Sequence, residues 1–275
     1  MGGRRSDITQ SSQTTYCLNL ESCILNYKPS AKKRPLKTLE RVLSKAGVGS
    51  RTEARAWVAQ GRVKVNGTIT RDPDHWIDMQ RDRVRLDDKP LETRERVYVL
   101  LYKPSGYLTT YKDPKGRPTV YDLVTAVGTF VSPVGRLDLD TSGLLLMTND
   151  TQFAERVTNP LSHVPKTYLV KASTVLTDAQ LQMLRDGIEL ADGMTRPAIV
   201  HRLRDSSKYT HVEITLTEGR NRQVRRMVEA LGARVLKLVR VKIGPIGIGA
   251  LPIGKWRLLT RSEVAAFTAT RRNRG

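Results

Sequence analysis

The 275-residue sequence has few of the residues that build disulfide-bonded or metal-binding proteins. Its two cysteines, Cys17 and Cys23, match no zinc site or disulfide framework, and its four histidines form no recognisable ligand or triad pattern. No apolar run approaches the roughly 20 residues of a membrane-spanning helix. The sequence therefore argues against a disulfide-rich, metal-dependent or membrane-spanning protein, and it favours a reducing, cytoplasmic location.

Acidic residues are scarce as well. Lys and Arg number 47 against 27 Asp and Glu, which gives a formal net charge of +20. A charge of this sign and size predicts a polyanionic partner, and nucleic acid is the favoured class. Docking on an anionic membrane normally needs an amphipathic helix with large apolar residues opposite the cations, and no clear example occurs. We therefore expect an RNA or DNA partner and no membrane partner.

The two ends of the chain differ in composition from its middle. Residues 1–35 are rich in Ser, Thr, Gln and Lys and lack the arrangement of a signal peptide, so we expect a disordered leader. Residues 270–275, TRRNRG, are expected to form a frayed basic tail.

Two helices are predicted at the start of the folded region. Apolar residues recur at helical spacing from Leu36 to Ala46, where Gly47 ends the pattern. A second helix is predicted to begin at Ser50, whose spacing to Glu53 is typical of a capping box, and to end near residue 61.

A β-hairpin is predicted to follow the two helices. A strand over 62–65 leads into Asn66-Gly67, the dipeptide that best tolerates the positive φ angles of a tight turn, and alternation resumes at 84–86. The pattern indicates a compact helix-helix-hairpin domain over residues 36–95.

A larger α+β domain is predicted over residues 96–269. Strand-like and helix-like patterns alternate here, and we expect a mixed, largely antiparallel central sheet flanked by helices. Strands are predicted at 97–102, 144–148, 167–172, 211–217, 234–243 and 255–259, and helices at 152–158, 177–186, 221–231 and 262–268.

Basic side chains recur at helical spacing in the small domain, at Lys37, Arg41 and Lys45 and again at Arg51 and Arg55. Like charges four residues apart repel each other on a helix, so an external anion would relieve them. On spacing alone, RNA binding and a merely solvated basic face fit this pattern equally well.

The run LERVLSKAGVGSRTEARAWVAQGRVKVNG resembles the αL-type RNA-binding domain first seen in a small-subunit ribosomal protein. The resemblance covers residues 36 to about 90. It implies that Arg51, Arg55 and the preceding glycine-containing loop face RNA phosphates. It does not imply catalysis, because enzymes and non-enzymes both carry this domain.

The stretch GRLDLDTSGLLLMTND, residues 135–150, combines a polar turn with a buried-strand pattern. A carboxylate held on a loop against a rigid sheet is well placed for chemistry, and Asp138 is the candidate. Asp140 and Thr141 are expected to hydrogen-bond the backbone of their own turn. The spacing of the two carboxylates gives no reason to expect a glycosidase pair.

A second informative segment lies between residues 219 and 242. It holds one acid, Glu229, so we favour a phosphate-binding wall over a surface ion-pair network. Its eight cations are Arg220, Arg222, Arg225, Arg226, Arg234, Lys237, Arg240 and Lys242.

These two segments, with KTYLV at 166–170 and RVKIGPIGIGALPIGKWRLLT at 240–260, resemble the RsuA/RluB family of ribosomal pseudouridine synthases. The resemblance implies that Asp138 is the nucleophile, that Arg225 pairs with it, that Tyr168 stacks on the target base, and that Arg136 helps displace this base. Arg220, Arg222 and Arg226 are then expected to bind RNA. The RNRQVRRM form leans towards the large-subunit enzymes of the family. No metal is expected, because the cysteines and histidines form no ligand pattern, and the isomerisation that the resemblance implies needs no cofactor. The glycine-rich 244–254 segment lacks dinucleotide-binding spacing, so a nucleotide cofactor is not expected either.

The predicted function is the isomerisation of a uridine in ribosomal RNA, free or in a pre-ribosomal particle, by a monomeric enzyme. The target base must leave its stack at a cost of a few kcal/mol, which contacts to the backbone and an aromatic partner can offset. A carboxylate in a closed pocket tends to protonate, and a neighbouring guanidinium opposes that tendency. Two alternatives remain: a non-catalytic RNA-binding or ribosome-assembly factor, and a base-releasing glycosylase.

Overall fold

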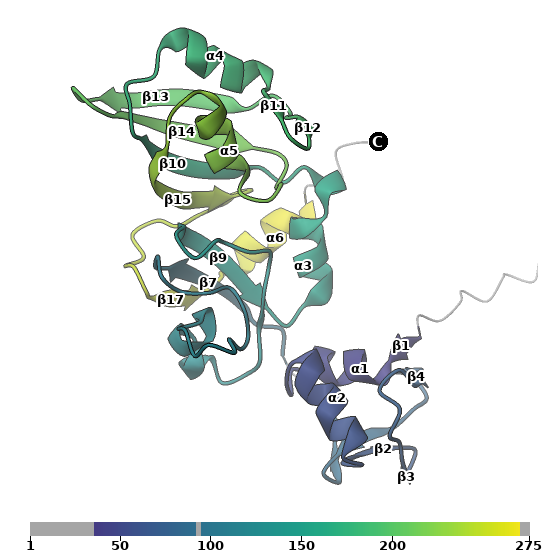
Figure 1. Ribbon diagram of the computed structural model, residues 1–275. Coiled ribbons are helices and arrows are strands. Elements are labelled where there is room, and N and C mark those ends of the chain that lie inside the picture. Colours follow the sequence, from purple (N-terminus) through teal and green to yellow (C-terminus); the bar gives the residue numbers. More distant parts are fainter. Residues whose placement is uncertain (1–35, 92–94, 270–275) are drawn as a thin grey trace, which may run out of the picture. The chain divides into compact units, whose positions relative to one another are not determined.

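The computed structural model describes residues 36–91 and 95–269 (Figure 1). The predicted leader with its two cysteines and the predicted basic tail lie outside the described residues. Residues 36–91 and 95–269 are each described by themselves below.

The first described part contains the two predicted helices, α1 (Leu39–Lys45) and α2 (Arg51–Ala59). The Ser50 hydroxyl accepts from the Glu53 backbone N–H at 3.2 Å, and the Glu53 carboxylate accepts from the Ser50 backbone N–H at 2.9 Å, so the predicted capping box is confirmed. The predicted turn at Asn66-Gly67 is also confirmed, with φ angles of 52° and 90°.

Four strands complete this part in the order β3-β2-β5-β6. They are β2 (Val63–Val65), β3 (Thr68–Ile69), β5 (Val84–Leu86) and β6 (Lys89–Pro90). Nine buried apolar residues join the helices to this sheet, namely Leu39, Val42, Leu43, Ala54, Val58, Val63, Val65, Ile77 and Val84.

The predicted start of the first helix is wrong. Residues 37–38 form a short strand, β1 (Lys37–Thr38), that pairs with β4 (Trp76–Ile77), and Leu36 is 51% exposed rather than part of the apolar stripe. The cause is tertiary: the backbone N–H of Leu39 donates to the His75 carbonyl at 2.8 Å, so the chain enters the helix only after pairing with a distant loop.

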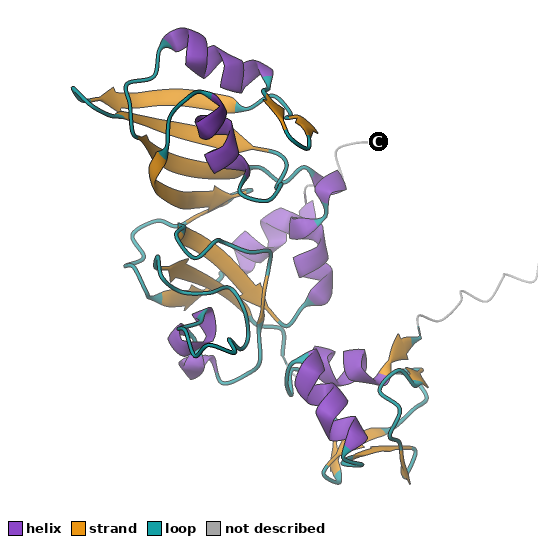
Figure 2. Cartoon of the chain, viewed as in Figure 1, coloured by secondary structure: helices purple, strands orange, loops and turns teal. Residues whose placement is uncertain are grey.

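The second part is built on a nine-stranded mixed sheet (Figure 2). Its main path runs β13-β14-β10-β15-β9-β7-β17, with β8 (Ser132–Pro133) beside β9 and β16 (Ile246–Gly247) beside β15. Neighbours pair antiparallel except β15 and β9, which are parallel, so the predicted α+β class with a largely antiparallel sheet is confirmed. The path strands are β7 (Tyr98–Lys103), β9 (Ser142–Thr148), β10 (Lys166–Ala172), β13 (Ile199–Asp205), β14 (Thr210–Leu216), β15 (Val235–Ile243) and β17 (Trp256–Leu258).

The sequence patterns located six of these strands and missed β13. Along β13 only Val200 faces the core, while Ile199 and Leu203 are exposed, so its apolar residues do not alternate as a half-buried strand should. Also missed were the short hairpin of β11 (Glu189–Leu190) and β12 (Gly193–Met194) and the 3-10 helices at Val120–Leu123, Thr125–Val127 and Pro160–Ser162.

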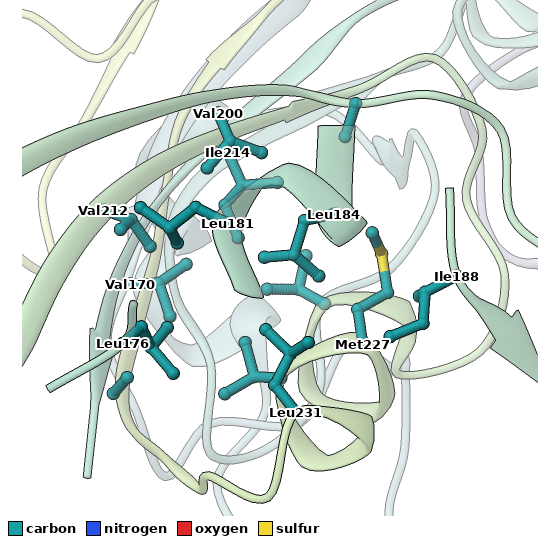
Figure 3. Close-up of a cluster of buried hydrophobic side chains, with 14 of the residues drawn as sticks. Val170, Leu176, Leu181, Leu184, Ile188, Val200, Val212, Ile214, Met227 and Leu231 are labelled. Carbon is teal, nitrogen blue, oxygen red and sulfur yellow. The ribbon is translucent and has the colours of Figure 1, made fainter. Parts of the chain in front are cut away.

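All four predicted helices of this part are present as α3 (Thr151–Thr158), α4 (Asp178–Asp186), α5 (Gln223–Ala230) and α6 (Arg261–Ala269). Helices α4 and α5 lie over one face of β13, β14, β10 and β15 (Figure 1). Figure 3 shows the cluster that joins them, in which Leu181 and Leu184 of α4 and Met227 of α5 meet strand residues such as Val212. The apolar side of α5 thereby fixes its N-terminus beside the loop that carries Asp138.

Candidate active site

The loop before β9 holds Asp138 and ends at Gly143, a position that only glycine fits. Gly143 has φ of +118° and lies opposite Arg240, where β9 and β15 pair in parallel. A Cβ at Gly143 would lie 2.2 Å from the Arg240 carbonyl oxygen and 2.5 Å from its backbone nitrogen. The glycine therefore lets β15 approach the end of the loop directly.

The side chain of Arg240 then holds both ends of the same loop. Its Nε donates to the Leu144 carbonyl at 2.8 Å, and its Nη1 lies 3.4 Å from the Arg136 carbonyl. Arg240 is only 4% exposed. Its guanidinium thus bridges two carbonyls that the sequence separates by the whole loop.

Lys103, at the end of β7, donates hydrogen bonds to backbone carbonyls in the middle of the loop. Its fully buried ammonium donates to the carbonyls of Asp138 at 3.0 Å, Thr141 at 2.8 Å and Pro104 at 3.0 Å. Burial lowers the pKa of Lys103 to about 8, although the nearby carboxylates of Asp138 and Asp140 act in the opposite direction. We call Lys103 and Arg240 the carbonyl clamp, because together they fix the loop through its backbone.

The Asp138 carboxylate is left at the surface of the site, with its side chain 36% exposed. The arginine closest to this carboxylate is not Arg225, the partner predicted from the sequence. Arg222 Nη1 lies 3.7 Å from Asp138 Oδ2, whereas Arg225 Nη2 lies 3.1 Å from Asp140 Oδ2 and donates to the Asp140 carbonyl at 3.1 Å. The ion pair predicted between Arg225 and Asp138 is therefore replaced by Arg222 with Asp138 and Arg225 with Asp140.

The cause of this exchange lies in the start of α5. Arg222 is the left-handed residue before the helix, with φ of 46°, and its side chain reaches both carboxylates, the second at 3.4 Å from Asp140 Oδ1. Arg225, one turn further on, is 9% exposed and points into the loop's interior, where its Nη1 also lies 3.3 Å from the Val235 carbonyl. The expectation that Asp140 bonds only its own turn is wrong for its carboxylate.

A pocket of about 460 Å³ opens beside Asp138. Tyr168 lines it from β10, on the same sheet face as its cross-strand partner Arg240. Lys166 lines the pocket two residues earlier, and burial, followed by repulsion from Arg240, lowers its pKa. Arg136 stands at the pocket with its side chain exposed, and within the described residues it forms no ion pair. The pocket thus brings together Asp138, Tyr168 and Arg136, as expected, and adds Lys166.

Four of the eight cations in the basic segment form ion pairs instead of the predicted open wall, namely Arg220, Arg222, Arg225 and Arg226. Arg226 forms a bidentate pair with Asp192, at 2.8 and 3.0 Å. Arg220 lies 3.3 Å from Glu218 and 3.4 Å from Asp192, and it also donates to backbone carbonyls of the β11–β12 hairpin. The prediction failed for these arginines because it counted acids only within the segment, whereas the carboxylates that pair with them belong to residues outside it.

In the small domain, too, some of the predicted RNA-binding cations form ion pairs within the protein and others do not. Arg55 contacts the Glu40 carboxylate and lies 2.9 Å from Asp74, so internal anions already compensate its charge. Lys37 lies in β1 and not on α1, yet it remains near Lys45, whose pKa is lowered first by burial and then by repulsion from Lys37. Arg41 and Arg51 are exposed and form no ion pair with any described residue.

Within residues 36–91 and 95–269, no group of three His, Cys, Asp or Glu side chains could hold a metal ion. In the same residues no helix has the length and apolar character needed to cross a membrane.

A family model described as RNA pseudouridylate synthase matches residues 97–230, and an S4 domain model matches residues 38–78. The chain is 39% identical over 236 residues to the ribosomal large subunit pseudouridine synthase B of Bacillus subtilis, covering 85% of this chain and 96% of that protein. It is 40% identical over 225 residues to the protein of the same name from Yersinia pestis, covering 79% and 71%.

One solved structure, a crystal structure of a pseudouridylate synthase, is similar with a TM-score of 0.60 and 33% sequence identity. It aligns with 84% of this chain and 99% of that chain.

Proposed function

Because the chain belongs to the RNA pseudouridylate synthase family, we propose that it converts a specific uridine of large-subunit ribosomal RNA into pseudouridine, with Asp138 as the catalytic carboxylate. The observation that carries the proposal is the placement of Asp138. Its carboxylate lies at a pocket, beside a guanidinium, on a loop whose backbone is held by the carbonyl clamp.

The reaction moves the glycosidic bond within one nucleotide. The bond between N1 of uracil and C1′ of ribose breaks, the base turns, and C5 bonds to C1′; C5 gives up its proton and N1 gains one. Asp138 serves this exchange either by attacking C1′ or by removing a ribose proton, and both routes need an ionised carboxylate at the sugar. Arg222, 3.7 Å away, places positive charge beside that carboxylate.

Tyr168 and Arg136 have roles at the base and at the RNA. Tyr168 presents an aromatic ring to the pocket, and stacking on a displaced base is worth about 1–3 kcal/mol. A tyrosine is a poor base at neutral pH, so stacking is its first role and proton transfer from the rearranged uracil its second. The exposed Arg136 guanidinium can occupy the space that the displaced base leaves.

RNA recognition away from the pocket falls to the S4 domain. The exposed Arg41 and Arg51, with Lys37 and Lys45, supply its free positive charge, and Arg55 contributes less because Glu40 and Asp74 already neutralise it. Repulsion between Lys37 and Lys45 is relieved when a phosphate binds between them.

Release of tritium from C5-labelled ribosomal RNA tests the activity. We expect tritium release by the purified protein without free uracil, together with the loss of one pseudouridine from the large-subunit rRNA of a strain that lacks the gene. RNA binding without tritium release would leave only an RNA-binding factor, and free uracil among the products would indicate a glycosylase.

A further inference from the structure

The two faces of the catalytic sheet carry different side chains, mainly apolar and buried on one face and polar and partly exposed on the other. Along β14, Val212, Ile214 and Leu216 are buried under α4 and α5, whereas His211, Glu213 and Thr215 alternate with them and stay partly exposed. We call the side that holds His211, Glu213 and Thr215, on β13, β14, β10 and β15, the reverse face. The pocket side of β10 and β15 instead carries Tyr168 and Arg240.

Three lysines stand at reverse-face positions. Lys171 of β10 lies directly opposite Lys237 of β15, and Lys242 of β15 lies opposite Thr167. Lys237 and Lys242 are exposed. Like charges directly opposite each other destabilise a pair of strands, so the Lys171 and Lys237 pair costs stability unless an anion lies over it.

Cations on the two faces of the sheet therefore differ in whether the protein itself supplies them with a partner. On the pocket side, the cations of this segment are occupied, either by carboxylates, as for Arg222 and Arg226, or by backbone carbonyls, as for Arg240. On the reverse face, Lys171, Lys237 and Lys242 form no ion pair with any described residue. Glu213 is the single carboxylate at the reverse-face positions of these four strands in the part of the chain described.

We propose that the reverse face is a second RNA-contact surface, on which Lys171, Lys237 and Lys242 bind backbone phosphates of the ribosomal RNA that surrounds the target site. This proposal rests on the proposed RNA substrate but not on the chemistry at Asp138. Lys237 and Lys242 are five residues apart on one strand, which corresponds to about 16 Å. A nucleic-acid strand carries a phosphate every ~3.4 Å of duplex axis, so the surface can follow several phosphates in succession.

Neighbouring side chains suit RNA better than a lipid surface. The ammonium of Lys171 lies over the face of the Tyr209 ring, 4.1 Å from its centre, so a cation–π contact holds this cation at the edge of the reverse face. Basic groups next to an aromatic ring are the usual elements of a surface that binds nucleic acid. Membrane attachment at an interface needs a helix with a bulky apolar side, whereas the reverse face is a sheet that also carries His201 and His211.

Binding measurements on the full-length chain test the proposal. The triple variant Lys171→Gln, Lys237→Gln, Lys242→Gln is compared with wild type in filter binding to in vitro transcribed large-subunit rRNA, over about 50 to 200 mM salt. We expect at least tenfold weaker binding at the lower salt, and a slope of log K against log salt that is smaller in magnitude by about 2 to 3, since each lost phosphate contact removes about 0.9 or less.

A matched control removes the same charge elsewhere. Lys112, Lys115 and Lys255 are exposed and lie outside the reverse face, and their triple Gln variant should retain a slope within about one unit of wild type. Equal effects of the two triple variants would overturn the proposal, because net charge alone would then explain them. Unchanged rRNA binding by the reverse-face variant would also overturn it. If this variant bound rRNA like wild type but lost binding to phosphatidylglycerol vesicles, measured in parallel, the surface would be assigned to a membrane instead.

The binding readout separates this proposal from the proposed function. If wild-type protein releases no tritium from rRNA but the salt slope changes as expected, the reverse face still binds RNA and the catalytic assignment alone is wrong. If tritium is released but the salt slope does not change, the proposed function stands and the reverse-face proposal is wrong.

Discussion

Replacing Gly143 with alanine should uncouple the catalytic loop from the sheet. The new Cβ would lie 2.2 Å from the Arg240 carbonyl oxygen, whereas ordinary contact begins at 3.4 Å, so the two backbones must separate by about 1.2 Å. The φ of +118° adds strain, because an alanine rarely adopts a positive φ. Together these effects predict a loss of about 3 kcal/mol in unfolding free energy and a fall in Tm of about 8 °C.

The catalytic effect should exceed what the stability loss explains. Arg240 holds the Leu144 carbonyl at 2.8 Å, and a shift of about 1 Å there would move Asp138 enough to lower the single-turnover rate about 100-fold. Thermal melts and single-turnover tritium release, both at a temperature where the variant is folded, measure the two effects.

Gly128→Ala is the matched control. Gly128 also has a positive φ, +75°, but a Cβ there would meet nothing within 4 Å. We expect it to lose about 1–2 kcal/mol from backbone strain and to keep its turnover rate. If Gly143→Ala kept wild-type turnover, or if both variants behaved alike, close approach between β9 and β15 would not be what positions the catalytic loop.

Arg222→Gln, which removes the guanidinium paired with the Asp138 carboxylate, should lower the single-turnover rate about tenfold; an unchanged rate would show that this guanidinium does not support the carboxylate. Burial lowers the pKa of Lys103 to about 8 from an ordinary 10.5, so between these values the unfolded chain binds more protons than the folded chain, and the folded chain gains stability as pH rises. Urea unfolding should therefore find wild type gaining on Lys103→Met from about pH 8 to about pH 10, and a constant difference would contradict the burial of a charged ammonium. Deleting the S4 domain, residues 36–95, should scatter or abolish modification of the proper uridine in mapped rRNA while leaving some tritium release from short RNA; unchanged site choice would refute this division of labour.

Local patterns were enough to predict most of the fold. Alternation located β10 and β14, helical spacing located α3 to α6, and a continuous apolar run located β7, which is buried on both faces. They could not locate β13, whose exposed Ile199 and Leu203 break the alternation, nor the β1–β4 pairing that delays the first helix.

The candidate site was predictable as a set of residues but not as a set of contacts. The family resemblance of the segments around Asp138 and Tyr168 predicted both residues for the site, and both line one pocket. Partner choice depends on distances between segments far apart in the sequence, so the exchange between Arg222 and Arg225 could not be predicted. Lys103 was missed for the same reason, because its role depends on carbonyls about 35 residues away that carry no side-chain signature.

The central claim is that the carboxylate of Asp138 performs the chemistry, and a comparison of Asp138→Asn with Asp140→Asn tests it most directly. Both substitutions remove one negative charge from the same loop and from the reach of Arg222. In single-turnover assays on labelled rRNA, we expect Asp138→Asn to lose at least about 10⁴-fold in rate while it binds RNA as tightly as wild type, and Asp140→Asn to lose about tenfold. Wild-type turnover by Asp138→Asn, or equal losses for the two variants, would contradict the account.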